Sequence, residues 1–144
     1  MTEIAEVSRR VRQMIERARA DATERRARAD ADTEIAQRFI QDVATPVARQ
    51  VASVLRSEGF AFRLSTPPGA VRLVSDGRTE NYLDVAVDTT VDPVTITTEV
   101  SHERGRRVAT VERPLRADAA LSDLTDQDVL LFFLEALPTF VARQ

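Results

Sequence analysis

The chain has 144 residues, of which 43% are hydrophobic and 30% charged, with a formal net charge of −3. This composition is typical of one globular domain with an extension and excludes a disordered chain. The absence of cysteine excludes disulfides, thiol catalysis and zinc–thiolate sites. Because His102 is the only histidine, carboxylates remain as metal ligands, and they suit Mg²⁺ or Ca²⁺.

The N-terminal segment carries no basic stretch followed by an apolar run, so no secretory signal is visible. The longest apolar run, Val129 to Leu134, is far shorter than the ~18 residues that a membrane span needs. We therefore expect a soluble, cytosolic protein without membrane contact.

Residues 2–58 are predicted to be helical, because apolar or small residues recur there every three or four positions. No Gly or Pro interrupts the pattern before Pro46, and Gly59 supplies the stop. The sequence allows a kink or a split at two places, the Asp30–Thr33 stretch and Pro46. A continuous helix of this length spans ~85 Å, so its first half should project from a small domain.

The apolar face of this helix changes along its length. From Ile35 to Leu55 it is wide and bulky, which indicates a helix that faces a core. Before Ala29 it is narrow and shrinks to alanines, which favours close contact with another helix. We therefore divide the chain into a projecting helical or coiled-coil segment, residues 1–32, and a globular α+β domain, residues 33–144. The predicted oligomer interface consists of Val7, Val11, Ile15, Ala18, Ala22 and Ala29.

The projecting segment is rich in arginine, and three of these residues, Arg12, Arg19 and Arg26, recur every seven positions beside the narrow face. Charges at this position select partners in coiled coils. Contact with a polyanion is the alternative, but no aromatic residue interleaves the arginines for base stacking. Acids precede arginines by four residues in four pairs, which supports an exposed helix: Glu6–Arg10, Asp21–Arg25, Glu24–Arg28 and Glu34–Arg38.

Residues 60–113 are predicted to form five short strands, because apolar residues alternate between turn signals such as Asp76-Gly77. Tight turns imply an antiparallel meander. Centring the third turn on Val91 and Asp92 pairs Val87 with Ile96 and Leu83 with Val100. Centring the fourth turn on Arg104 and Gly105 pairs Val100 with Ala109. One face of the sheet is then apolar throughout.

The other face is polar, and this register sets Asp84 directly opposite Glu99. Such a pair is a weak candidate for a cation site, and a solvated pair near an arginine is the alternative. Arg72 is predicted to stack on Tyr82 across the second hairpin. His102 lies near the tip of the Ser101–Arg106 turn and is predicted to be an exposed loop residue. General-base catalysis would need a nucleophile and an orienting group held around it.

A C-terminal helix is predicted after the capping box Thr125–Asp128. It is apolar almost all round, so we expect burial on more than one side. The fold class is therefore α+β: a long N-terminal helix, a five-stranded antiparallel meander and a C-terminal helix, with both core helices on one face of the sheet. Besides the N-terminal face, Phe132, Phe133 and Phe140 are candidates for contacts between copies.

No phosphate-binding loop, catalytic constellation or cofactor motif is present, so we assign no catalytic, cofactor or metal residues. The leading hypothesis is a non-enzymatic protein–protein interaction module, a self-associating adaptor, chaperone or assembly factor. Its partners would be a second copy, with a dimer favoured, and another protein. The first alternative is a nucleic-acid-associated protein that uses the arginine-rich helix. The second is a metal-dependent enzyme built on carboxylates.

Overall fold

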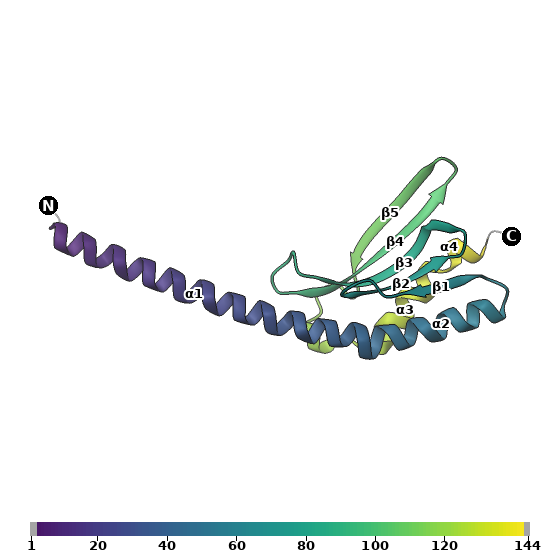
Figure 1. Cartoon of the computed structure of the whole chain (residues 1–144), viewed down its shortest axis with the longest axis horizontal. Coiled ribbons are helices and arrows are strands. Elements are labelled where there is room, and N and C mark those ends of the chain that lie inside the picture. Colours follow the sequence, from purple (N-terminus) through teal and green to yellow (C-terminus); the bar gives the residue numbers. More distant parts are fainter. Residues whose placement is uncertain (1–2, 143–144) are drawn as a thin grey trace.

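A computed structural model describes residues 3–142 (Figure 1). Residues 1–2 and 143–144, which the two predicted segments include, lie outside the described residues. One continuous helix leads the chain. It consists of α1 (Ile4–Phe39), a π-helical turn η1 (Ile40–Ala44) and α2 (Thr45–Ser57). The first part of α1 projects from the rest of the molecule, as the sequence predicts.

The long helix is irregular at one place, the π-helical turn η1. The helix runs through Asp30–Thr33 without a break, and the irregularity lies directly before Pro46. Proline lacks an N–H, and its ring clashes with the carbonyl four residues earlier, here that of Asp42. A wider turn relieves this clash. The Thr45 N–H donates to the Ile40 carbonyl, and the Thr45 hydroxyl donates to the same oxygen at 2.7 Å.

Gly59 ends the long helix, as predicted. It has a φ of +90°, a conformation that favours glycine. The Phe60 N–H donates to the Leu55 carbonyl at 2.8 Å, and the Gly59 N–H donates to the Arg56 carbonyl at 3.0 Å. These two bonds form a Schellman motif, which satisfies carbonyls at the helix end and turns the chain toward the sheet.

The sheet is a five-stranded antiparallel meander in the order β1-β2-β3-β4-β5, which confirms the predicted topology. The pairings Val87 with Ile96 and Leu83 with Val100 are also confirmed. The strands are β1 (Phe62–Ser65), β2 (Ala70–Ser75), β3 (Arg78–Asp88), β4 (Thr95–Arg104) and β5 (Arg107–Pro114).

The predicted pairing of Val100 with Ala109 is wrong, because Val100 pairs with Val111 and His102 with Ala109. The fourth turn is centred one position later than expected, on Gly105 and Arg106, and Arg104 pairs with Arg107 across it. Gly105 has a φ of +62° and takes the first central position of the turn. The shift is two residues in the pairing, so each side chain keeps its predicted face.

After β5 follow the 3₁₀-helical turn η2 (Leu121–Asp123), α3 (Asp126–Ala136) and the short α4 (Pro138–Val141). The capping box between Thr125 and Asp128 is present, and the Thr125 N–H donates to the Asp128 carboxylate at 2.8 Å. Pro138 opens α4, in the first turn of a helix where a proline N–H is not needed.

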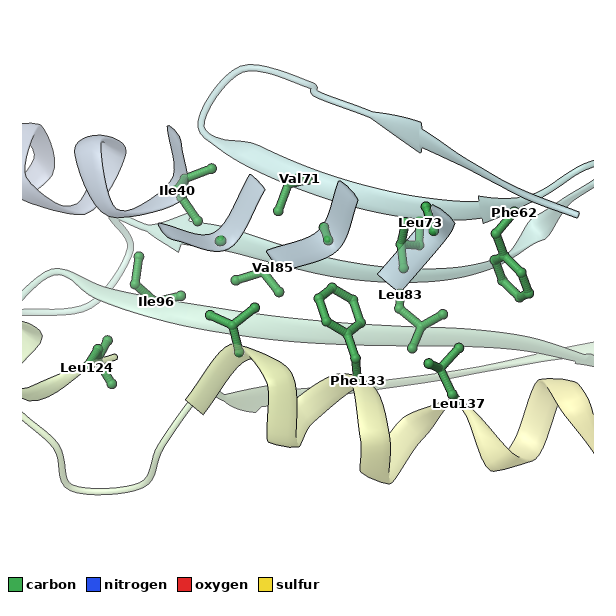
Figure 2. Close-up of a cluster of buried hydrophobic side chains, with 14 of the residues drawn as sticks. Ile40, Phe62, Val71, Leu73, Leu83, Val85, Ile96, Leu124, Phe133 and Leu137 are labelled. Carbon is green, nitrogen blue, oxygen red and sulfur yellow. The ribbon is translucent and has the colours of Figure 1, made fainter. Parts of the chain in front are cut away.

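The core lies between the sheet and the two helices α2 and α3, which both cover one face, as predicted (Figure 2). Phe133 reaches from α3 toward the sheet and is fully buried. The long helix contributes mostly alanines to the core, Ala44 from η1 and Ala48 and Ala52 from α2, together with Leu55. The buried residues of the sheet and α3 include Leu73, Leu83, Val85, Ile96, Val129 and Phe133.

Candidate interaction sites

The arm, which we define as residues 4–31 of α1, has no buried residue. Asp32 and Thr33 are half-buried, and Ala36 is the first fully buried side chain of the helix. The last turns of α1 contact β3 and η2, whereas the arm extends away from the body (Figure 1). The arm therefore receives no apolar cover from its own chain.

The predicted interface residues all lie on this arm. We call them the stripe: Val7, Val11, Ile15, Ala18, Ala22 and Ala29. All are exposed except Ala22, which is half-buried. Ile4 is 87% exposed and Met14 57%, and both border the stripe. Large apolar side chains in a row on an exposed helix are a candidate contact surface.

The stripe points to the same side of the helix as the buried residue Ala36. At roughly 100° per residue, Ala18 lies in line with Ala36, and every stripe residue lies within about 60° of that direction. The apolar face that is covered by the sheet in the body thus continues uncovered along the arm. A partner on the stripe would lie on the body side of the helix.

The three arginines Arg12, Arg19 and Arg26 follow one flank of the stripe and are exposed. Two of the four expected ion pairs form, Glu6–Arg10 at 3.0 Å and Glu34–Arg38 at 2.7 Å. The pairs Asp21–Arg25 and Glu24–Arg28 are not among the ion pairs of residues 3–142. The three flank arginines form no ion pair within residues 3–142. Their charges are therefore available to a partner.

A second apolar surface, which the sequence did not predict, is a groove of about 590 Å³ between α2 and α3. It lies on the side of the helices away from the sheet. Leu134 and Val54 stand at its sides, 56% and 61% exposed. The C-terminal helix α3 contacts both the sheet and the long helix, so it is covered on more than one side as predicted, but Leu131 and Leu134 stay exposed. The apolar lining includes Val47, Val51, Val54, Leu130, Leu134 and Val141.

The three phenylalanines proposed for contacts between copies lie elsewhere. Phe133 is fully buried in the core, so the expectation that it contacts a second copy is wrong. Phe140 packs edge-on against Phe62, with ring centroids 5.9 Å apart, and against His102 at 5.4 Å. Phe132 is half-buried against the core. Periodicity alone did not separate the inner from the outer face of α3, because both are apolar.

His102 is not an exposed loop residue, so that prediction is wrong. It belongs to β4, lies on the covered face of the sheet and is buried. Phe140 of α4 packs edge-on against the imidazole, with ring centroids 5.4 Å apart, and this contact is formed by a residue far along the chain. Its role in packing is clear from this contact.

The polar face of the sheet carries a closed cluster of four side chains. Asp84 is directly opposite Glu99, as predicted. Two hydrogen bonds join Arg72 to one Asp84 oxygen, at 2.6 and 2.8 Å, and the Tyr82 hydroxyl donates to Glu99. The guanidinium also lies 3.8 Å from the centre of the Tyr82 ring, which confirms the predicted cation–π pair. A bulge between Val74 and Ser75 places Arg72 opposite Asp84 and diagonal to Tyr82.

Burial dominates the electrostatics of this cluster. Asp84 is only 5% exposed, and its Oδ1 accepts no hydrogen bond from residues 3–142. Burial raises the pKa of the Asp84 carboxyl, and the Arg72 guanidinium offsets this only in part. Burial and the bond to Glu99 raise the pKa of Tyr82. Arg72 and Tyr82 thus reduce the repulsion between the carboxyl groups of Asp84 and Glu99.

The described residues hold no group of three or more histidine, cysteine or acidic side chains placed to bind one metal ion. Within residues 3–142, the search for a helix long and apolar enough to cross a bilayer also finds none. Comparison of the chain with family models, with curated proteins and with solved structures finds no match.

Proposed function

We propose that this chain is a non-enzymatic protein–protein interaction module that self-associates through its arm. The observation that carries the proposal is the uncovered stripe, which continues the buried face of the same helix. A helix that exposes a row of Val and Ile side chains gains by burying them, at roughly 25 cal/mol per Å². A second copy offers the same surface at the same concentration, so a homodimer is the simplest assembly.

The physical case for a partner rests on helix stability as well. Most helical stability in proteins comes from packing of an amphipathic face and not from intrinsic propensity. The arm is long, without glycine or proline, and within residues 3–142 none of its side chains is buried. Pairing of two arms would supply the missing packing and bury the stripe of each. A further protein partner and the cytosolic location stay predictions.

Light scattering of the full chain over a wide concentration range tests this proposal. We expect a mass that rises from 16.0 kDa toward twice this value as concentration increases. Two glutamates placed on the stripe, Val11→Glu with Ile15→Glu, should hold the chain at the monomer mass, because burying a carboxylate in the contact is costly. The matched control, Gln13→Glu with Thr23→Glu, adds the same charge to the opposite, exposed side of the arm.

The control should associate as the unchanged chain does. A monomer mass for the unchanged chain at every concentration would overturn the proposal. Loss of association in both variants alike would assign the effect to charge and not to the stripe. Titration of labelled DNA and RNA separates the nucleic-acid alternative, because polyanion binding weakens steeply with salt. Association through burial of apolar residues does not weaken steeply as salt is added.

A further inference from the structure

We infer that the arm binds the arm of a second copy running in the opposite direction, with Ile4 of one copy beside Ala29 of the other. This rests on the proposed self-association and adds the identity and direction of the partner. The inference comes from the order of side-chain sizes along the stripe, from the position of one arginine and from the length of the uncovered helix.

Two series of positions, each repeating every seven residues, run along the body side of the arm. They alternate with spacings of four and three, which is the seam pattern of a two-stranded coiled coil. Apart from Ser8 and Arg25, the first half of the seam carries bulky side chains and the second half carries alanines. One series is Ile4, Val11, Ala18 and Arg25, and the other is Ser8, Ile15, Ala22 and Ala29.

An antiparallel pair matches large with small in each apolar layer. Facing positions then sum to a constant, so Ile4 meets Ala29, Val11 meets Ala22 and Ile15 meets Ala18. Each layer holds one bulky residue and one alanine, and the two axes stay evenly spaced. A parallel pair sets bulky against bulky at one end and alanine against alanine at the other. Since interaxial distance follows the contact side chains over about 8–10 Å, that arrangement is uneven.

The position of Arg25 distinguishes antiparallel from parallel pairing, independently of the side-chain sizes. Arg25 lies on the body side of the helix, between Ala22 and Ala29. In a parallel pair, Arg25 of one copy faces Arg25 of the other inside the seam, where like charges repel and are partly desolvated. In the antiparallel pair it faces Ser8, which is small and accepts a hydrogen bond.

The length of the uncovered helix agrees with this register. Burial by the chain's own body begins at Asp32, and the antiparallel overlap ends at Ala29. The seam from Ile4 to Ala29 therefore lies within the part of the helix that the body leaves exposed. The overlap covers 26 positions, or about 39 Å at the α-helical rise. That is close to four heptads, the length at which a heptad pattern indicates a coiled coil.

The arginine flank opposes this arrangement weakly. Antiparallel pairing brings the flank of Arg12, Arg19 and Arg26 alongside the same flank of the second copy. These side chains are exposed, so the repulsion is screened by salt and small. Glu16 lies within about one turn of both Arg12 and Arg19 on its own helix and lowers the local charge. Added salt should therefore leave association unchanged or slightly stronger.

The chain contains no cysteine, so single introduced cysteines test the direction cleanly. Full-length Ile4→Cys and Ala29→Cys chains are prepared separately, checked for self-association by light scattering, then mixed and oxidised. We expect disulfide-linked dimers containing one chain of each kind, identified by intact mass. Each variant oxidised alone should give few disulfide-linked dimers, because the sulfurs of the two chains in an antiparallel pair lie about 37 Å apart along the axis.

A spin label at Ala27→Cys, on the side of the arm away from the seam, supplies a second readout without a disulfide. The antiparallel pair predicts a distance on the order of 35 Å between labels, and a parallel pair about 20 Å. Efficient linkage of each variant with itself, or the short distance, overturns the antiparallel inference and leaves self-association intact. Absence of any dimer by light scattering overturns both proposals.

Discussion

The two halves of the long helix have the same apolar side but different neighbours. In α2 the side chains of Ala48, Ala52 and Leu55 are buried against the sheet. In the arm, Val11 and Ile15 point the same way and are exposed. The difference teaches that a helical apolar pattern indicates a face that needs cover, without indicating whether the cover comes from the same chain or another.

The largest difference between the halves should appear in hydrogen exchange. Amides of α2 near Ala48 and Ala52 are expected to exchange only through opening that approaches global unfolding, a protection of about 5–15 kcal/mol. Amides of the arm in a dilute, monomeric sample should open with a free energy near zero. Mass spectrometry of exchanged peptides at low and high protein concentration measures both.

At high concentration, pairing of arms should slow exchange around Val11 to Ala22 and leave α2 unchanged. Strong protection of the arm in the monomer would break the comparison, because it would mean that the arm is covered or stable by itself.

Removal of a core side chain should have the next largest effect. Phe133→Ala deletes a fully buried ring between α3 and the sheet, and cavities of this kind cost about 3–5 kcal/mol. Val11→Ala on the arm should change the unfolding free energy of the monomer by less than about 0.5 kcal/mol. Urea denaturation at protein concentrations too low for self-association measures the unfolding free energies of the two variants. Equal losses would show that the arm is part of the folded body.

A second comparison replaces two alanines that lie on the same side of the long helix, one buried and one exposed. Ala36 is fully buried, so Ala36→Leu should overpack the contact with the sheet and lower the unfolding free energy by about 1–3 kcal/mol. Ala18→Leu adds the same side chain in line with it on the exposed arm and should leave monomer stability unchanged within about 0.5 kcal/mol. Denaturation of both variants checks the contrast.

Light scattering of Ala18→Leu should show weaker self-association, because the leucine would face Ile15 of the second copy where an alanine fits. If Ala18→Leu lowered the unfolding free energy of the monomer, the stripe would be packed against the body of its own chain.

The smallest expected effect concerns the polar face of the sheet. Burial raises the pKa of the Asp84 carboxyl above its unfolded value, so the folded state holds its proton to higher pH. The contribution of Asp84 to stability is therefore full below pH 3.8 and is lost as pH rises through the raised value. The unfolding free energy of the wild type, relative to Asp84→Asn, should fall over that range.

Urea denaturation at several pH values measures this difference. The control Glu112→Gln lies on the exposed strand β5 and should show no such trend relative to the wild type. A difference that grows with pH would mean that the bond to Arg72 outweighs burial.

Sequence reasoning reached the fold through repeating patterns, which depend on local geometry. Alternation in β3 and β4 fixed which residues face the core, and the spacing of Val87 and Ile96 around the third turn fixed their pairing. It failed at the fourth turn, because Gly105 suits either central position and only the packed sheet selects one. It also failed at His102, which is buried against Phe140, a residue far along the chain.

The candidate sites divide in the same way. The stripe and its flank of arginines were readable from periodicity, and so was the opposition of Asp84 and Glu99. The groove between α2 and α3 was not readable, because α3 is apolar around its circumference and the pattern does not distinguish its inner from its outer side.

By itself the sequence determined the element order, the meander, the helix end at Gly59 and the apolar side of the long helix, because all of these follow from local backbone preferences and side-chain period. Tertiary structure alone decided which part of that side is covered and which face of α3 meets the sheet. These outcomes depend on contacts between residues far apart in the chain, and no local pattern records such contacts.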